Sequence, residues 1–227
     1  MGDPVSWVIL GLVGGLVGVD ATALGQAMVS RPIVAATLGA WVFGRPAEGL
    51  ILGAALELFE LCILPVGAAR TPEGGTGALA AGAAYAVAAP AGLAPVPLAL
   101  ALAFGLIAER LAGETVVLLR RVNGRLVGDA ALDAMRGARA LVARHLTGIG
   151  LDFARGAGVS VAAALAGSVL LRALPDVSPD MGRAASVMMA LVLPGMAGAG
   201  AAALAGGARV GAFLAGLAVG SGLWLVL

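Results

Sequence analysis

Two glutamates interrupt an apolar stretch that runs from Gly49 to Leu61. Glu57 and Glu60 are three residues apart, so on a helix their carboxylates share one face. A carboxylate at bilayer depth costs roughly 2.5–3.5 kcal/mol on insertion scales, and such residues usually face a cavity and act there. These two acids are therefore the best indication of a functional site, although Glu57 could instead pair with Arg31, since buried charges are normally neutralised.

The composition predicts a membrane protein and excludes several other classes. Of the 227 residues, 60% are hydrophobic and 12% are charged, whereas a soluble domain carries about 25% charge. A net charge of +1 with 4% aromatic residues gives no sign of a nucleic-acid-binding surface. The single cysteine, Cys62, excludes an internal disulfide. The lone His145 has no partners for a metal site or a catalytic pair, so we expect no enzyme activity, metal or cofactor.

The elements around the two acids are unusually short. A first span is predicted over residues 5–24, followed by apolar pieces over 32–43 and 46–64 that fall short of the roughly 20 residues a spanning helix needs. Pro32 and Pro46 suit the first position of a helix. This pattern predicts a re-entrant or broken hairpin over 32–64 that lines a watery cavity; two tilted, kinked spans are the alternative.

The rest of the chain predicts further helices packed through small residues. Arginines between residues 110 and 145 indicate a cytoplasmic segment, with a helical apolar face. Spans are expected over 156–174 and 210–227, and between them a helix capped by Ser178 with a kink at Pro194. We predict an all-α, polytopic fold with one membrane domain over 1–227. It includes a substrate hairpin and loop at 32–75 and a charged cytoplasmic segment at 109–147.

Several motifs resemble the membrane C component of the mannose/fructose/sorbose-type sugar phosphotransferase system (PTS). They are the Arg31-Pro32 start of an apolar piece, the run Gly49-Leu50-Ile51-Leu52-Gly53-Ala54-Ala55-Leu56-Glu57, and the loop Gly67-Ala68-Ala69 followed by Pro72-Glu73. The resemblance is specific over about residues 14–80. Beyond that stretch it rests on length, hydropathy and the charged central segment.

The resemblance implies a sugar permease subunit of the bacterial inner membrane. The C component of this family pairs with a D-type membrane subunit in an oligomer within the lipid bilayer, and binds a sugar that an elevator-like movement carries across. Separate cytosolic A and B proteins transfer the phosphoryl group. Glu57 matches the intramembrane acid of the family, and Pro72 and Glu73 match its Pro-Asp/Glu loop.

On this reading, Glu57 accepts hydrogen bonds from sugar hydroxyls, because carboxylate and amide oxygens suit such donors. The expected substrate-binding residues are Glu57, Glu60, Gln26, Asp20, Thr71 and Glu73. Two positions depart from the family: Gly25 stands where relatives often carry an acid, and Pro65 where a relative has Asn. These departures leave two alternatives open, a membrane scaffold or regulatory subunit that moves no sugar, and a permease for another small solute that works without the phosphotransferase system.

Overall fold

The described part of the chain is built from helices and their connections. The computed structural model describes residues 2–61, 71–128, 137–173 and 179–226; Cys62, Pro65 and Ser178, on which predictions were made, lie outside these ranges. The helices are α1 (Pro4–Thr22), α2 (Pro32–Trp41), α3 (Pro46–Glu60), α4 (Gly74–Ala88), α5 (Pro95–Gly128), α7 (Ala138–Arg172), α8 (Pro179–Leu204) and α9 (Arg209–Val226). The predicted all-α fold is confirmed.

Within the described ranges, four helices are long and apolar enough to cross a membrane, namely α1, α5, α7 and α8. By contrast, α2 has 10 residues and α3 has 15, which at 1.5 Å per residue gives about 15 and 22 Å. Both fall short of a hydrocarbon core about 30 Å thick. Pro32 and Pro46 each occupy the first helical turn, as predicted. The chain is therefore a multi-pass membrane protein that contains broken, short helices.

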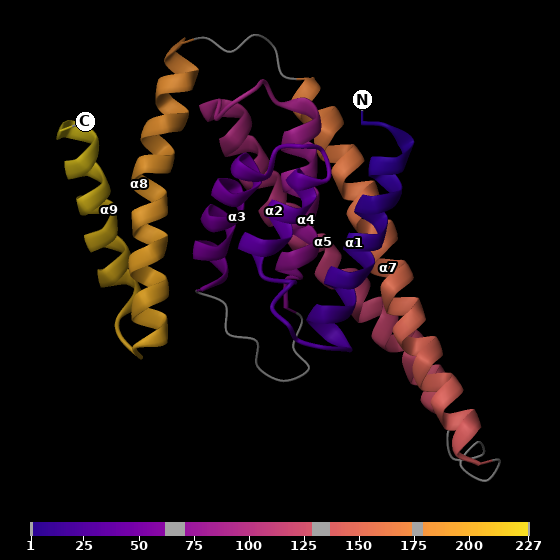
Figure 1. Ribbon diagram of the computed structural model, residues 1–227. Coiled ribbons are helices and arrows are strands. Elements are labelled where there is room, and N and C mark those ends of the chain that lie inside the picture. Colours follow the sequence, from indigo (N-terminus) through magenta and orange to yellow (C-terminus); the bar gives the residue numbers. More distant parts are fainter. Residues whose placement is uncertain (1, 62–70, 129–136, 174–178, 227) are drawn as a thin grey trace.

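Glycines set the distances between the short helices, as the composition predicts. A side chain at Gly53 would lie 2.7 Å from the Pro32 carbonyl oxygen, so α3 packs directly on the α2 backbone. On another side of α2, Gly39 meets the Leu79 carbonyl and Gly82 meets the Ala36 carbonyl of the facing helix. The helices α2, α3 and α4 consequently form one closely packed group at the centre of the molecule (Figure 1).

The short helix α4 begins beside the middle of a long helix. The Glu73 backbone N–H donates to the Glu109 carbonyl oxygen at 2.9 Å, and a side chain at Gly77 would lie 2.7 Å from the Cβ of Glu109. Because α5 extends from Pro95 to Gly128, it continues well past the point where α4 starts. The ends of the short helices are thus enclosed by longer neighbours.

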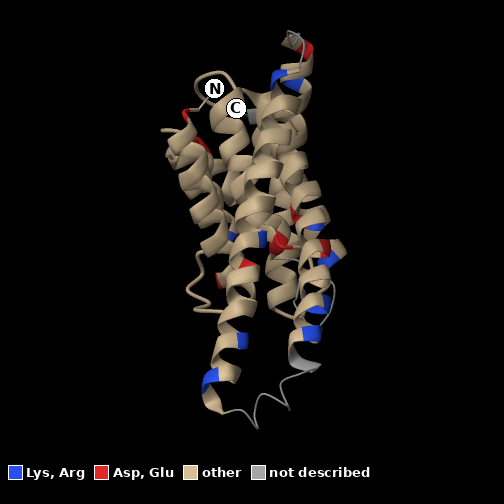
Figure 2. Ribbon diagram, turned by 90° about the vertical axis from the view of Figure 1, so that its right-hand side faces the viewer, with Lys and Arg blue, Asp and Glu red and all other residues tan. Residues whose placement is uncertain are grey.

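The charged central segment, for which one helical apolar face was predicted, is not a single helix in the described residues. It forms instead the ends of two long helices, because α5 continues to Gly128 and α7 starts at Ala138, well before the predicted span at 156. These ends project together from the bundle (Figure 1), and arginines lie along them (Figure 2). The prediction placed the helix boundaries where charge appears, whereas backbone hydrogen bonding continues through the charged turns. The helix α8 also continues through Pro194, from Pro179 to Leu204.

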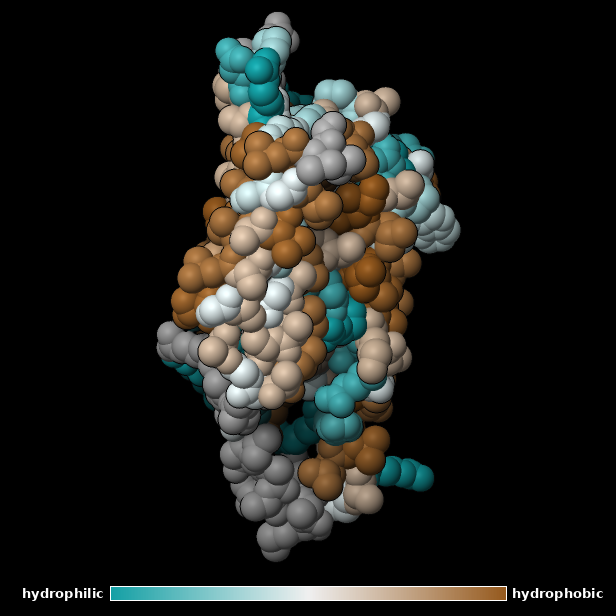
Figure 3. All heavy atoms as spheres, turned by 90° about the vertical axis from the view of Figure 1, so that its left-hand side faces the viewer, coloured by the Kyte–Doolittle hydropathy of each residue, from teal (hydrophilic) through white to brown (hydrophobic). Residues whose placement is uncertain are grey.

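The C-terminal helices α8 and α9 form a hairpin at one side of the group (Figure 1). Gly216 and Gly220 of α9 meet the carbonyl oxygens of Pro194 and Ala190 in α8. The outward face of this hairpin is largely apolar (Figure 3), and Leu214 is 58% exposed. An apolar surface of this kind is compatible with contact to lipid.

Arg45 bridges the turn between α2 and α3 and the connection between α4 and α5 through hydrogen bonds. Its guanidinium donates to the carbonyl oxygens of Ala89 and Pro90, both at 2.8 Å, and its Nε donates to Glu48 at 3.0 Å. The same group lies over the Tyr85 ring, 5.2 Å from its centroid. This end of the short-helix group is therefore held by several charge-assisted hydrogen bonds.

The glycine contacts predict a contrast between two neighbouring positions of α7. A Cβ at Gly156 would lie 2.6 Å from the Gly14 carbonyl of α1, whereas one at Gly158 has nothing within 4 Å. We expect Gly156→Ala to destabilise the protein by about 1–3 kcal/mol through overpacking. Gly158→Ala should leave stability unchanged or raise it by up to about 1 kcal/mol, since Ala is the better helix former. Thermal unfolding in detergent measures both, and equal stability of the two variants would contradict this packing.

Candidate functional site

A polar cavity of about 330 Å³ lies where the three short helices end. Arg31 precedes α2, Glu60 ends α3, and Glu73 precedes α4, while α1 and α5 close the other sides. The residues that line it are Ala21, Thr22, Ser30, Arg31, Glu60, Thr71, Pro72, Glu73, Gly74, Gly75, Gly113, Val116, Val117 and Arg120. Its volume is in the range of small-molecule sites, which starts at about 300 Å³.

Glu60 is the acid of this cavity that remains available to a ligand. Within the described residues, its carboxylate makes neither a hydrogen bond nor an ion pair; Glu57, Arg31 and the buried Glu109 are its electrostatic neighbours. The carboxylate also lies against Gly74 so closely that a Cβ there would overlap it. Glycine at position 74 therefore allows the acid to reach the start of α4, where the first N–H groups of a helix have no intrahelical partner.

Glu57 forms an ion pair with Arg31 and does not line the cavity. Its second oxygen, Oε2, accepts a hydrogen bond of 3.2 Å from the Ile33 backbone N–H in the first turn of α2. The side chain of Glu57 is 15% exposed and that of Arg31 is 45% exposed. Glu57 thus neutralises the cation, satisfies the start of α2 and leaves part of Arg31 facing the cavity.

Glu73 belongs to a buried ion-pair network that crosses the bundle. Both of its carboxylate oxygens accept hydrogen bonds from Arg155 of α7, at 2.6 and 2.7 Å. Arg155 also binds Asp152 at 2.9 Å and donates to the Thr115 hydroxyl of α5 at 3.1 Å. Because all three charged side chains are at most 8% exposed, this network fixes the start of α4 against α5 and α7.

Thr22 extends the network to the end of α1. Its hydroxyl contacts Asp152 Oδ2 and the Gly18 carbonyl oxygen. Asp152 therefore has one oxygen toward Arg155 and the other toward Thr22. The last turn of α1, the first turn of α4 and the middle of α7 are held by one chain of polar contacts.

Asp20 organises the loop between α1 and α2. Its buried carboxylate accepts hydrogen bonds from the backbone N–H groups of Ala27 at 2.5 Å and Ser30 at 2.9 Å. The loop contains Gln26 with φ 47° and Gly25 with φ 91°, so it turns tightly around this acid. Gln26 itself is exposed and is absent from the lining of the polar cavity.

The structure thus divides the six residues predicted from sequence into two groups. Glu60, Thr71 and Glu73 line the polar cavity, whereas Glu57, Asp20 and Gln26 lie outside its lining. The sequence reasoning missed Asp152 and Arg155, which complete the network around Glu73. The i,i+3 spacing of these two charged residues could have indicated an ion pair. Both residues lie just before position 156, however, where the predicted span begins.

The ion pair between Arg31 and Glu57 predicts a specific pattern of stability. Glu57→Met alone leaves a partly buried arginine without its partner and should destabilise the protein, whereas Arg31→Met with Glu57→Met should recover much of that loss, since replacing both partners is often neutral. Thermal unfolding of the single and double variants in detergent measures this coupling. Additive effects would show that the pair does not contribute as a unit.

The network around Arg155 predicts a larger effect. Arg155→Met leaves Glu73 and Asp152 buried and unpaired, a change that typically costs about 3–5 kcal/mol. Arg139→Met, a change of the same kind at an exposed position of α7, is the matched control and should stay within about 0.5 kcal/mol of wild type. Similar unfolding temperatures for both variants would contradict the structural role of the network.

Comparisons with known proteins agree with the architecture and identify the family. A sequence profile described as "PTS system sorbose-specific iic component" matches residues 4–181, well over half of the chain. No curated protein matches at a significant level. A solved structure described as "Structure of membrane protein" shares the fold, with a TM-score of 0.74 and 18% identity over 90% of this chain and 79% of that one. The chain therefore belongs to the sorbose-specific IIC family, the membrane components of sugar permeases of the phosphotransferase system.

Proposed function

We propose that this chain binds a sugar in the polar cavity at the ends of α2, α3 and α4 and carries it across the membrane. The observation that supports the proposal most strongly is the Glu60 carboxylate in the polar cavity, which makes no hydrogen bond or ion pair with the described residues. An acid at membrane depth without a structural partner is a functional site by default. Family membership supports the same class of substrate.

The cavity offers donors and acceptors in an arrangement that suits vicinal hydroxyls. Glu60 would accept from two sugar hydroxyls, while the exposed part of Arg31 and the hydroxyl of Thr71 would donate to others. Glu73 retains acceptor capacity, since each carboxylate oxygen has two lone pairs and Arg155 uses one on each. Glycines at positions 74, 75 and 113 let the Glu60 carboxylate, the Ser30 carbonyl and the Thr71 carbonyl pack closely at the cavity wall.

Glu57, Asp20 and Gln26 have supporting roles in this proposal. Glu57 sets the position of Arg31, and Asp20 holds the loop that brings Ser30 and Arg31 to the cavity wall. Gln26 is exposed on that loop and would meet the sugar only after the loop moves. Glu57, which matches the intramembrane acid of the family, would therefore act on the sugar through Arg31.

The wider assembly follows the family pattern. The chain would work in the bacterial inner membrane with a D-type membrane subunit in an oligomer, and residues 1–227 would form one membrane domain that moves the sugar by an elevator-like displacement of one part against another. Separate cytosolic A and B proteins would perform the phosphoryl transfer, so this chain is the translocation subunit. The segment 32–75 supplies the sugar-binding hairpin and loop, and 109–147 supplies the cytoplasmic arms.

The decisive test is uptake of radiolabelled sugars, L-sorbose, D-mannose and D-fructose, in cells that lack other permeases and carry the partner proteins. Glu60→Gln keeps the shape of the side chain but removes its charge, and a hydrogen bond to a charged group contributes about 1.5–3 kcal/mol. We expect uptake to fall by at least about tenfold, with normal amounts of protein in the membrane. Asp180→Asn, at a 92% exposed acid, is the control and should transport normally.

Two outcomes would count against the proposal. Normal uptake by Glu60→Gln would remove this acid from the sugar site. No uptake of any sugar by wild type, even with the D, A and B proteins present, would instead favour a scaffold or regulatory subunit. Uptake that persists without the A and B proteins would favour a permease independent of phosphorylation.

A further inference from the structure

Glu109, in the middle of α5, is a buried acid to which the transport proposal gives no role. Among the described residues the buried acids are Asp20, Glu73, Glu109 and Asp152, and Glu109 is 5% exposed. The other three accept hydrogen bonds from backbone, arginine or threonine. The Glu109 carboxylate makes neither a hydrogen bond nor an ion pair within the described ranges. A buried carboxyl group without a partner is normally neutral, because an isolated charge is costly in an apolar surrounding.

The first turn of α4 brings Glu109 close to Glu60 of the polar cavity. The Glu60 carboxylate occupies the space beside Gly74, and a side chain at Gly77 would lie 2.7 Å from the Cβ of Glu109. Because these glycines are three residues apart, they lie on one face of α4. Glu60 and Glu109 therefore approach the same face of α4, one from α3 and the other from α5, and they repel one another electrostatically.

Glu109 lies behind the wall of the polar cavity. Gly113, which lines the cavity, follows Glu109 by four residues, so both lie on one face of α5. Glu109 itself does not belong to the lining, whereas Glu60 does. A ligand in the cavity would consequently contact Glu60 and leave Glu109 as a second acid behind it.

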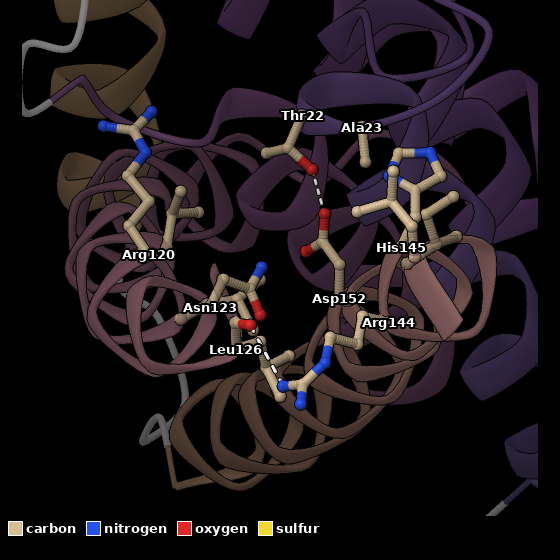
Figure 4. A pocket seen from close by; sticks show the side chains of 13 residues that line it. Thr22, Ala23, Arg120, Asn123, Leu126, Arg144, His145 and Asp152 are labelled. Carbon is tan, nitrogen blue, oxygen red and sulfur yellow. Dashed lines mark hydrogen bonds between the residues drawn. The ribbon is translucent and has the colours of Figure 1, made fainter. Parts of the chain in front are cut away.

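The charged groups of α4 and α7 near this pair already hold one another. Arg155 binds both oxygens of Glu73 and also binds Asp152. Figure 4, a close view of the hollow between α5 and α7, shows the Asp152 carboxylate directed at the hydroxyl of Thr22. These side chains therefore offer Glu109 no unengaged cation.

The other elements packed around the pair also lack a cation that contacts Glu109. Arg31, before α2, pairs with Glu57 of α3. The charged side chains nearest along α5, and those of α8, are exposed: Arg110, Glu114, Asp180 and Arg183. Among the described residues, Glu60 is accordingly the charged group whose field acts on Glu109.

Two carboxylates in one low-dielectric region cannot both be charged at little cost. Such groups titrate as a pair, and the first proton to bind belongs to the pair. Hydrogen bonds from a ligand favour the charged form of the acid that accepts them, and the cavity places Glu60 in that position. The proton of the pair would then lie on Glu109.

A ligand also strengthens the interaction between the two acids. A sugar in the cavity displaces water that screens Glu60 from Glu109, and the repulsion between two charges grows as the effective dielectric constant falls. A sugar would therefore bind better when Glu109 is neutral than when it is charged.

We propose that Glu109 is a proton-binding site coupled to the sugar cavity, so that sugar binding at Glu60 favours uptake of one proton by Glu109. The Glu109 carboxylate takes the proton from solution and forms one O–H bond, and no other bond changes. By linkage, the affinity for sugar is highest where Glu109 is protonated and falls as rising pH removes that proton. The inference rests on the proposed transport function and adds a proton to the same site.

Infrared spectra of the full chain in detergent test for the proton without any sugar, since a protonated carboxyl group and a carboxylate absorb at different frequencies. We expect a protonated-carboxyl band at neutral pH in wild type and its loss in Glu109→Gln. Glu114→Gln, at an exposed acid of the same helix, is the matched control and should keep the band. Absence of the band in wild type, or its full retention in Glu109→Gln, would overturn the inference.

Calorimetric titration with L-sorbose, D-mannose and D-fructose tests the coupling between about pH 6 and about pH 9, where strongly perturbed carboxyl groups titrate. In wild type we expect the affinity to fall by about tenfold toward the alkaline end, as for acids that interact strongly enough to titrate as a pair. Two buffers of different ionisation enthalpy should show proton uptake on binding. Glu109→Gln should bind with an affinity independent of pH and without proton uptake, whereas Glu114→Gln should behave as wild type.

The outcomes distinguish failure of the coupling from failure of the transport proposal. A wild-type affinity independent of pH, or the same pH dependence in Glu109→Gln, would overturn the coupling and leave sugar binding in place. If none of the sugars binds at any pH, the transport proposal fails and the coupling fails with it, although the infrared band still reports the proton on Glu109. If Glu109→Gln does not fold, Glu60→Gln should shift the loss of the band to lower pH by removing the opposing charge, and an unchanged titration would overturn the inference.

Discussion

A helix that ends inside an apolar bundle leaves backbone N–H or C=O groups without partners, and in a membrane no water replaces them. The fold depends on how this constraint is met at the ends of α2, α3 and α4. Glu57 accepts from the first turn of α2, Asp20 accepts from two N–H groups of the preceding loop, and the Glu109 carbonyl accepts from the start of α4. The buried acids Glu57 and Asp20 therefore supply acceptors that the short helix α2 and the loop before it require.

This view separates acids that support the architecture from Glu60, which lines the polar cavity. Asp20 and Glu57 are engaged with backbone and arginine, and Glu73 is bound on both oxygens by Arg155. Glu60 has no such engagement among the described residues and faces the cavity. The polar network and the proposed ligand site thus share one region, but different side chains would supply rigidity and binding capacity.

The sequence was sufficient to predict the membrane class, the short helices at Pro32 and Pro46, and the close packing through glycine, because hydrophobicity, proline and small residues act locally. It also pointed to Glu60, Thr71 and Glu73, which the fold brings to one cavity. The pair between Arg31 and Glu57 was predicted only as an alternative, and the contact between Arg155 and Glu73 was not predicted at all, since these pairs are 26 and 82 residues apart and depend on tertiary packing. The ends of α5 and α7 were misjudged because charge was taken to mark a helix boundary.

The glycine contacts have a practical consequence for genetics. At Gly156 even a methyl group would meet a facing backbone, so most amino-acid substitutions there should lower the amount of folded protein and, with it, any growth that depends on transport by this chain. A saturation library scored by growth alone would consequently rank this position beside Glu60, although one position serves assembly and the other, in the proposed function, serves ligand recognition. Measuring the amount of each variant in the membrane with a fluorescent fusion would distinguish the two kinds of defect.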